Sequence, residues 1–218
     1  PRILTPNMTD QSIMADNEKI GVFGGAFNPI HNGHINLAKQ YMKELSLDKL
    51  LFIPTAVPPH KSAIGLADET DRLNMLKLAI DGIDKFEVSD IEFKRTGKSY
   101  TYDTLTELKK IYPLSNFYLI IGADQLFNFD KWYKYKEILS LVTLCTSARE
   151  YESEKAEMLD FANSLDALDK NKFFILKTPV LKVSSSEVRE KIKRGEDVSS
   201  LLPKSVYNYI RERGLYNV

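Results

Sequence analysis

The stretch GVFGGAFNPIHNGH, residues 21–34, decides the fold that we predict for this chain of 218 residues. It begins inside an apolar run at 19–23 that is typical of a buried strand, and it leads into a helix expected to start near His34. The adjacent glycines Gly24 and Gly25 favour a turn with a positive φ, or with room for a ligand close to the backbone. Amide groups at the start of a helix, together with the helix dipole, favour a phosphate at this place.

Two of the chain's three histidines, His31 and His34, lie one helical turn apart around Gly33. One histidine beside a glycine turn would more often be an ordinary surface or core residue. Two of them, in H-x-G-H spacing directly after a Gly-Gly turn, favour a phosphate site instead. Each imidazole could contribute a hydrogen bond of roughly 1.5–3 kcal/mol to a phosphate oxygen.

The pattern G-G-x-F-N-P-x-H-x-G-H resembles the signature of the nucleotidylyltransferase superfamily, in which H-x-G-H binds a nucleotide triphosphate. From the first strand onward the chain is similar to the bacterial nicotinate-mononucleotide adenylyltransferases, and their further motifs recur in order. The resemblance implies that Gly24, Gly25 and Phe27 border ATP together with the histidine pair. The chain departs from the family at Ala26, where Thr or Ser is common, and at Asn28, where Asp is common.

Composition narrows the classes of function. With 43% hydrophobic residues, the chain can form one substantial α/β core. Basic and acidic residues balance at 30 each, so no nucleic-acid partner is expected. The single cysteine, Cys145, excludes an internal disulfide and a cysteine-based zinc site, and its apolar surroundings predict an inert buried thiol. Without an apolar run of about 18 residues or a signal-peptide pattern, we expect a cytoplasmic protein that is not attached to a membrane.

Apolar runs and helical patterns alternate along the chain. Residues 1–18 show no such period and are expected to form a flexible extension. The sequence beyond them predicts a single doubly wound, Rossmann-like α/β domain over 19–218, with a parallel sheet and a small helical part from about residue 183. The expected strands are 19–23, 50–53, 87–93, 116–121, 141–146 and 173–176, and the expected helices begin near residues 34, 69, 101, 151, 184 and 203.

Pro-Pro-His-Lys at 58–61 follows the second predicted strand, at the end where ligands bind in open α/β sheets. Alone, this segment is typical of a rigid connector with a solvated lysine. The resemblance makes His60 and Lys61 candidates for contacts to the acceptor phosphate or to the departing pyrophosphate. We expect the following stretch, 62–68, to be mobile and able to close over substrate.

Gly-Lys-Ser at 97–99 looks like the end of a phosphate-binding P-loop, but that motif needs a glycine where this chain has Glu92. The resemblance points instead to S-Y-T-Y-D-T, in which Ser99 and Thr101 would contact the pyridine carboxylate of the acceptor. A carboxylate suits the N-terminus of the helix that follows. Thr101 could equally be only the N-cap of this helix, and both roles can hold together.

Three further segments resemble parts of the family's site. Asp124 follows a central strand and would accept hydrogen bonds from a ribose diol, although a structural turn residue is an equal alternative. The only tryptophan, Trp132, would stack on the pyridine ring beside Tyr133, while packing is the usual role of an isolated tryptophan. Arg149 is also an acceptor-site candidate, but Glu-Tyr at 150–151 replaces the family's Pro-Gly and leaves the direction of its side chain open.

A second phosphate-binding end is predicted where a helix begins after Lys182. Ser184 and Glu187 form a capping box, which alone marks only a helix start. Ser185, Ser186 and Arg189 add hydroxyl groups and a cation, and the segment resembles the family's I-S-S-T-x-I-R. This end is expected to face the histidine pair across the carboxyl edge of the sheet and to hold the triphosphate.

The resemblance implies transfer of AMP from ATP to nicotinate mononucleotide, which gives nicotinate adenine dinucleotide and pyrophosphate in NAD synthesis. The acceptor phosphate would attack the α-phosphorus directly, with His31, His34 and Arg189 as the catalytic residues and no covalent intermediate. Mg²⁺ is expected as a cofactor held mainly by phosphates and water, so no metal-binding residues are predicted. The alternatives are another acceptor, such as nicotinamide mononucleotide or phosphopantetheine, and a nucleotide sensor without turnover. A homodimer is compatible with the sequence.

Overall fold

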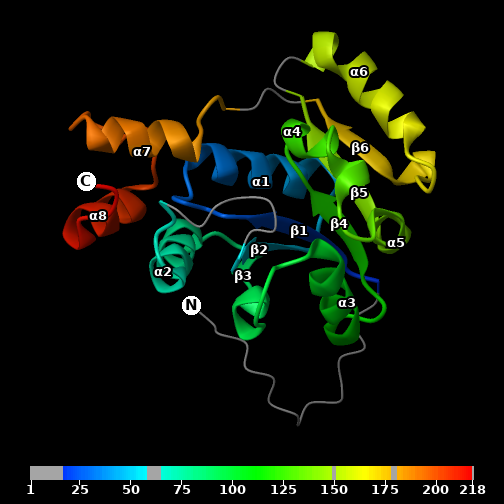
Figure 1. Cartoon of the computed structure of the whole chain (residues 1–218), viewed down its shortest axis with the longest axis horizontal. Helices are drawn as coiled ribbons and strands as arrows, with labels where there is room; N and C mark the ends of the chain where they lie inside the picture. The colour runs from blue at the N-terminus through cyan, green and yellow to red at the C-terminus, as the bar shows by residue number, and fades with distance from the viewer. Residues whose placement is uncertain (1–16, 58–64, 149–150, 178–180, 218) are drawn as a thin grey trace.

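The structure, a computed structural model, describes residues 17–57, 65–148, 151–177 and 181–217 (Figure 1). Each strand except the short β3 is a largely apolar run, as expected for a parallel sheet that is covered on both faces. The strands are β1 (Lys19–Gly25), β2 (Lys49–Pro54), β3 (Phe86–Val88), β4 (Asn116–Ile120), β5 (Val142–Ser147) and β6 (Phe173–Leu176).

The strands form one six-stranded sheet in the order β3-β2-β1-β4-β5-β6, and every neighbouring pair is parallel. Val22 of β1 lies between Leu51 of β2 and Leu119 of β4. The direction of winding reverses between β1 and β4, which is where open α/β sheets bind ligands. The predicted doubly wound parallel sheet is therefore confirmed.

Two hydrophobic cores cover the two faces of the sheet. One contains Phe23 and Phe52 with residues from the helices α1 (Asn32–Glu44), α2 (Glu69–Ile80), α7 (Ser185–Lys193) and α8 (Lys204–Arg213). The other contains Val22 and Leu51 with residues from α3 (Thr101–Ile111), α4 (Ala123–Leu126), α5 (Tyr135–Leu141) and α6 (Tyr151–Ser164). Figure 1 shows α7 and α8 together at one end of the molecule, beside α1 and α2, with α6 at the other end.

The predicted strand at 87–93 is wrong in its second half. β3 has only three residues, and a 3₁₀ helix, η1 (Ile91–Lys94), follows it. The alternation of apolar residues continues past Val88, but pairing with β2 stops there. The reason is that Glu92 turns inward, where a hydroxyl group of α3 binds its carboxylate. The two other short 3₁₀ helices are η2 (Phe129–Lys131) and η3 (Lys170–Lys172).

The predicted helix starts lie within two residues of the observed ones. α8 follows Pro203 and ends at Gly214, whose φ of 61° is the left-handed conformation expected after a helix. Glu18, which we expected in the flexible extension, is bound to the sheet: its carbonyl accepts the Asn116 amide at 2.8 Å, and its carboxylate pairs with Lys49 at 3.2 Å. The rest of the predicted extension, 1–16, lies outside the described residues. No helix in the described ranges has the length and apolar character to cross a bilayer.

Packing of α2 against the sheet can be tested with two leucines of the same helix. Leu76 is fully buried in the first core, whereas Leu78 is 37% exposed. We expect Leu76→Ala to lower the free energy of unfolding by about 2–5 kcal/mol, because it leaves a cavity. The control Leu78→Ala should cost about 1 kcal/mol or less. Urea denaturation measures both, and equal losses would contradict this packing.

Candidate functional site

The turn between β1 and α1 gets its shape from an aromatic residue. Neither Gly24 nor Gly25 has a positive φ; the positive φ, 45°, belongs to Phe27. The ring of Phe27 is buried and lies 5.6 Å from the Phe23 ring and 5.8 Å from the Phe52 ring. This packing offsets the cost of the left-handed backbone.

The two glycines of this turn have different roles. A Cβ added at Gly25 would come within 3.3 Å of the Phe27 ring, so this glycine leaves room for the aromatic packing. A Cβ added at Gly24 would meet no atom within 4 Å. The space beside Gly24 is therefore open, and a ligand can approach the strand there.

His31 and His34 cap the start of α1 for each other. The amide of His34 donates to Nδ1 of His31 at 3.4 Å, and the amide of His31 donates to Nδ1 of His34 at 3.2 Å. Their rings stack with centroids 3.7 Å apart. Because both Nδ1 atoms accept, each neutral ring carries its proton on Nε2. The pair therefore presents two Nε2–H donors.

Burial keeps both histidines neutral at pH 7. It lowers the pKa of His31 to about 4, and it lowers the pKa of His34 well below the usual value, with a further contribution from the neighbouring His31. Gly33 makes the stack possible, because a Cβ there would lie 3.0 Å from the His31 ring and 3.3 Å from the Leu181 carbonyl. An anionic phosphate at the Nε2 atoms would favour the charged form of either ring.

The start of α7 contacts the histidine turn, so the structure brings the two predicted phosphate ends together. The Ser185 hydroxyl donates to the Pro29 carbonyl at 2.9 Å, and Nη1 of Arg189 donates to the Asn28 carbonyl at 2.7 Å. Nη2 of Arg189 donates to the Ser186 hydroxyl at 3.2 Å.

Only half of the predicted capping box forms at this helix. The Ser184 hydroxyl accepts from the amide of Glu187 at 3.1 Å. The Glu187 carboxylate instead lies 4.0 Å from Lys191, one turn further along α7. The start of α7 therefore has its own cap, and Ser185 and Ser186 remain for other partners.

A cavity of about 340 Å³ lies at the carboxyl ends of β1 and β4. Seven residues predicted from the sequence line it: Gly24, Gly25, Ser99, Thr101, Asp124, Trp132 and Tyr133. His31, His34, Phe27 and the predicted α7 residues are not in its wall. The candidate site thus has two parts, a cavity and a histidine face, which the end of β1 connects. The predicted residues His60, Lys61 and Arg149 lie outside the described residues.

Three aromatic side chains, Tyr100, Trp132 and Tyr133, line one part of the cavity. Trp132 is half-buried and packs on Phe129, with ring centroids 5.0 Å apart. Tyr133 is 48% exposed and lies 4.8 Å from the Tyr100 ring. Nζ of Lys134 lies 5.4 Å from the centre of the Tyr133 ring, which adds a cation beside this part of the wall.

Thr101 is not the N-cap of α3. The N-cap is Tyr100, and no side chain caps this helix start. Ser99 pairs with Val57 and does not cap α3. Its hydroxyl accepts from the amide of Val57 at 3.4 Å, and its own amide donates to the Val57 carbonyl at 3.0 Å. The start of α3 therefore meets the cavity without a side-chain cap, which is the condition an anion needs to bind there.

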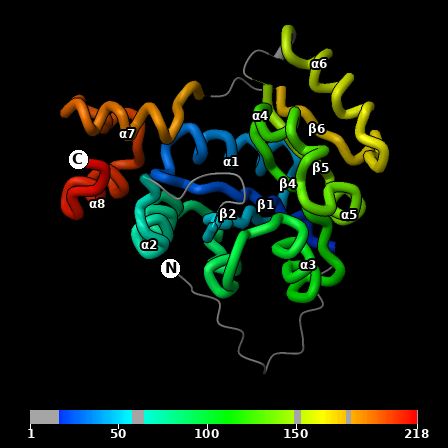
Figure 2. Tube along the Cα trace, viewed as in Figure 1, coloured from blue at the N-terminus to red at the C-terminus, as the bar shows by residue number. Residues whose placement is uncertain are grey.

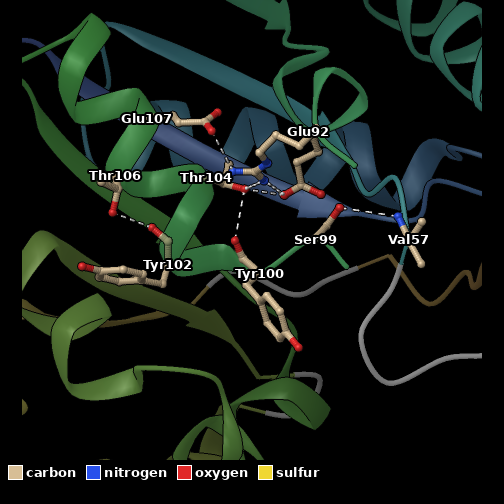
Figure 3. Close-up of polar contacts among 9 residues, drawn as sticks. Val57, Glu92, Ser99, Tyr100, Tyr102, Thr104, Thr106 and Glu107 are labelled. Atoms are coloured by element: carbon tan, nitrogen blue, oxygen red, sulfur yellow. Dashed lines mark hydrogen bonds and ion pairs between the residues drawn. The ribbon is translucent and has the colours of Figure 1, made fainter. Parts of the chain in front are cut away.

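Sequence reasoning missed Glu92, which it used only to reject a P-loop. Glu92 is 7% exposed and lines the cavity. Figure 3 shows its hydrogen bond with Thr104. The Thr104 hydroxyl donates to Oε1 of Glu92 at 2.7 Å, and Arg95 donates to the same hydroxyl at 2.6 Å. Arg95 also pairs with Glu107 at 3.4 Å. The only signal in the sequence was the spacing of Glu92 and Arg95, an acidic and a basic residue three positions apart, shortly before S-Y-T at 99–101.

Glu92 connects the wall of the cavity to the first turn of α3. Its Oε2 atom is buried and has no hydrogen-bond partner among the described residues. Burial raises the pKa of its carboxyl group, against the opposing effects of Thr104, Ser99, Arg95 and the Ala56 backbone. This network fixes α3 relative to the segment after β2.

The described residues contain no group of three or more His, Cys, Asp or Glu that could hold a metal ion. A site held only by protein ligands is therefore absent from these ranges. The donors that they do offer, Nε2–H groups, hydroxyl groups and guanidinium N–H groups, suit phosphate oxygens.

The chain is similar to a family model and to named proteins over most of its length. A family model described as cytidylyltransferase-like matches residues 22–191. A protein of Clostridium tetani named "Probable nicotinate-nucleotide adenylyltransferase" is 42% identical over 199 residues, which cover 91% of this chain and 99% of that protein. A protein of the same name from Dehalococcoides mccartyi is 42% identical over 200 residues, which cover 91% of this chain and 97% of that protein.

A solved structure shares the fold. It is the nicotinic acid mononucleotide adenylyltransferase of Plasmodium falciparum complexed with NaAD, with a TM-score of 0.76 and 20% sequence identity. The match covers 92% of this chain and 98% of that chain. At this identity the likeness shows the arrangement of strands and helices alone.

The buried histidine pair predicts a dependence of stability on pH. His31 has a pKa near 6.5 when unfolded and about 4 when folded, so its contribution is complete above pH 6.5 and is lost as the pH falls toward 4. We expect His31→Asn, which keeps a good N-cap, to have a flatter pH dependence of unfolding free energy in this window. Urea denaturation at several pH values between 7 and 4.5 measures it. Equal slopes for the variant and the unchanged protein would contradict the burial of a neutral imidazole.

Proposed function

The chain belongs to the cytidylyltransferase-like family and, within it, to the nicotinate-nucleotide adenylyltransferases, and we propose that it transfers AMP from ATP to nicotinate mononucleotide. The products are nicotinate adenine dinucleotide and pyrophosphate. One observation supports this function best: the cavity that Trp132 and Thr101 line reaches the end of β1, and the chain leads from there directly into the turn that carries the histidine pair.

The histidine face would bind the triphosphate of ATP. The Nε2–H groups of His31 and His34 would donate to phosphate oxygens, and the α1 dipole adds to the attraction. Ser186 and Arg189, at the start of α7, would hold the distal phosphates. Since Arg189 already donates to the Asn28 carbonyl, its guanidinium group is oriented before the nucleotide arrives.

The cavity would bind the acceptor and the ribose. Trp132 would stack on the pyridine ring, with Tyr133 at the rim. The amides at the uncapped start of α3, near Thr101, would bind the carboxylate of nicotinate. Asp124, which lines the cavity, would accept hydrogen bonds from a ribose diol. Gly24 leaves the backbone of β1 open between the two substrates.

The reaction needs no general base from the protein. The acceptor phosphate is already an anion, and its oxygen attacks the α-phosphorus while the bond to pyrophosphate breaks. Catalysis then consists of aligning the two phosphates and stabilising the charge that develops on the α-phosphate and on the leaving group. The two neutral Nε2–H donors can do this, because they strengthen their hydrogen bonds as the negative charge grows.

Mg²⁺ fits this site as an ion that ATP brings with it. The ion keeps several waters and needs few protein ligands when phosphates supply its oxygens. When bound, it would neutralise charge on the triphosphate. As an enzyme that consumes ATP in NAD synthesis, the protein would work in the cytoplasm.

The acceptor can be identified by measuring pyrophosphate release with ATP and Mg²⁺. The experiment compares the rates of pyrophosphate release with three acceptors: nicotinate mononucleotide, nicotinamide mononucleotide and phosphopantetheine. A strong preference for nicotinate mononucleotide is expected, because the start of α3 attracts a carboxylate. Activity with only one of the other acceptors would overturn the assignment of the ring pocket. ATP binding without pyrophosphate release from any acceptor would favour a nucleotide sensor.

Replacing His34 tests the phosphate site. His34→Ala removes one Nε2–H donor, and we expect kcat/KM to fall by about 10²–10³-fold, as for the loss of a donor to a transition-state oxygen. The variant should still fold, with a lower midpoint of thermal unfolding, because it loses the hydrogen bond from the His31 amide and the ring contacts with His31 and Phe27. The matched control is Asn36→Ala, at an exposed position of the same helix, which should keep full activity. Unchanged turnover in His34→Ala would remove the central role of the pair.

A further inference from the structure

Asn28 is a buried junction in the turn that carries the histidine pair. Its side chain is 4% exposed. Oδ1 accepts from the amide of Ala67 at 2.9 Å and from the Tyr216 hydroxyl at 2.8 Å, while Nδ2 donates to the carbonyl of Gly65 at 2.8 Å. The backbone carbonyl of Asn28 accepts from Arg189. One side chain thus connects the turn to two segments far away in the sequence.

An amide suits this junction better than a carboxylate would. One partner of Asn28, the Gly65 carbonyl, needs a donor, and two others, Ala67 N–H and Tyr216 O–H, need an acceptor. An aspartate could not donate to the carbonyl of Gly65. The departure from the family's common Asp therefore has a local explanation in this chain.

Tyr216 reaches this junction because of the way the chain leaves α8. Gly214 adopts the left-handed conformation, the amide of Leu215 donates back to Ile210 at 3.0 Å, and Tyr216 itself has a φ of 67°. This reversal packs Leu215 and Tyr216 against the first core. Figure 2 shows α8 at the same end of the molecule as α2 and α7. Burial raises the pKa of Tyr216 well above its usual value, while Arg189 and Arg72 lie near enough to oppose that rise. Its hydroxyl is therefore a neutral donor near both guanidinium groups.

We infer that Tyr216 is a positioning residue for the nucleotide, acting through Asn28 on the turn that aims His31 and His34. This inference rests on the proposed function, since it names a further residue on which the same ATP site depends. The Tyr216 hydroxyl donates to Oδ1 of Asn28 and so fixes this residue. The backbone carbonyl of Asn28 in turn orients Arg189 by accepting its hydrogen bond. The segment after α8 is thus part of the nucleotide half of the site, whereas the acceptor cavity has no residue from it in its wall.

The test is Tyr216→Phe, which removes one hydroxyl and keeps the ring in the core. We expect ATP to bind about three- to tenfold more weakly, as for the loss of one hydrogen bond. KM for the acceptor should not change. The control is Tyr207→Phe, because the Tyr207 hydroxyl has only an exposed contact of 3.5 Å with Arg211. Calorimetric titration with ATP alone gives the affinity without reference to any acceptor, and steady-state kinetics give the two KM values.

A double-mutant cycle separates positioning from general stability. If Tyr216 acts through Asn28, then Tyr216→Phe should weaken ATP binding much less in an Asn28→Ala background than in the unchanged protein. Equal ATP affinity in Tyr216→Phe and Tyr207→Phe would overturn the inference, and so would equal changes in both KM values. Failure of the unchanged protein to bind ATP would overturn the proposed function itself. Binding of ATP without turnover would overturn only the catalytic part of that function and leave the test of Tyr216 intact.

Discussion

The candidate site depends on side-chain hydrogen bonds to three backbone carbonyls of one turn. Where β1 ends, the carbonyls of Ala26, Asn28 and Pro29 have left the sheet and lie in the interior, where unpaired polar groups are costly. Each carbonyl accepts a hydrogen bond from a side chain far away in the sequence. The donor to Ala26 is Arg72, 46 residues away. The donor to Asn28 is Arg189, 161 residues away, and the donor to Pro29 is Ser185, 156 residues away. The geometry of the turn that carries the histidine pair therefore depends on contacts with both α2 and α7.

The proposed site would attract phosphate without a permanent positive charge on its histidines. Two imidazolium rings with centroids 3.7 Å apart would repel each other strongly, and burial disfavours the charge on each. In the proposed site the attraction would come from the N–H dipoles of the two Nε2–H groups and of the helix starts of α1 and α7, together with the guanidinium group of Arg189. Such an arrangement keeps the turn stable without a bound phosphate. Its attraction for the transferred phosphate would increase as negative charge develops there.

The fold could be predicted because its signals are local. Each strand except β3 is an apolar run whose neighbours in the sequence mark its ends. β3 was predicted too long because the inward turn of Glu92 depends on Thr104, twelve residues later. The positive φ was expected at a glycine, but packing against Phe23 and Phe52 places it at Phe27. Through the family resemblance the sequence indicated seven of the residues that line the cavity, whereas Glu92 and Asn28 have partners that no local pattern reveals.

The two halves of the site are supported by separate sets of contacts. On the acceptor side, Glu92, Thr104 and Arg95 tie η1 to α3, and Ser99 ties this region to the segment after β2. On the nucleotide side, the supports come from α2, α7 and the segment after α8. The two sets share the end of β2, where the Thr55 carbonyl accepts from Arg72 and the Val57 backbone pairs with Ser99. A change in one set can therefore shift its own substrate alone, while a change at the end of β2 must disturb the relative position of both phosphates, on which direct transfer depends.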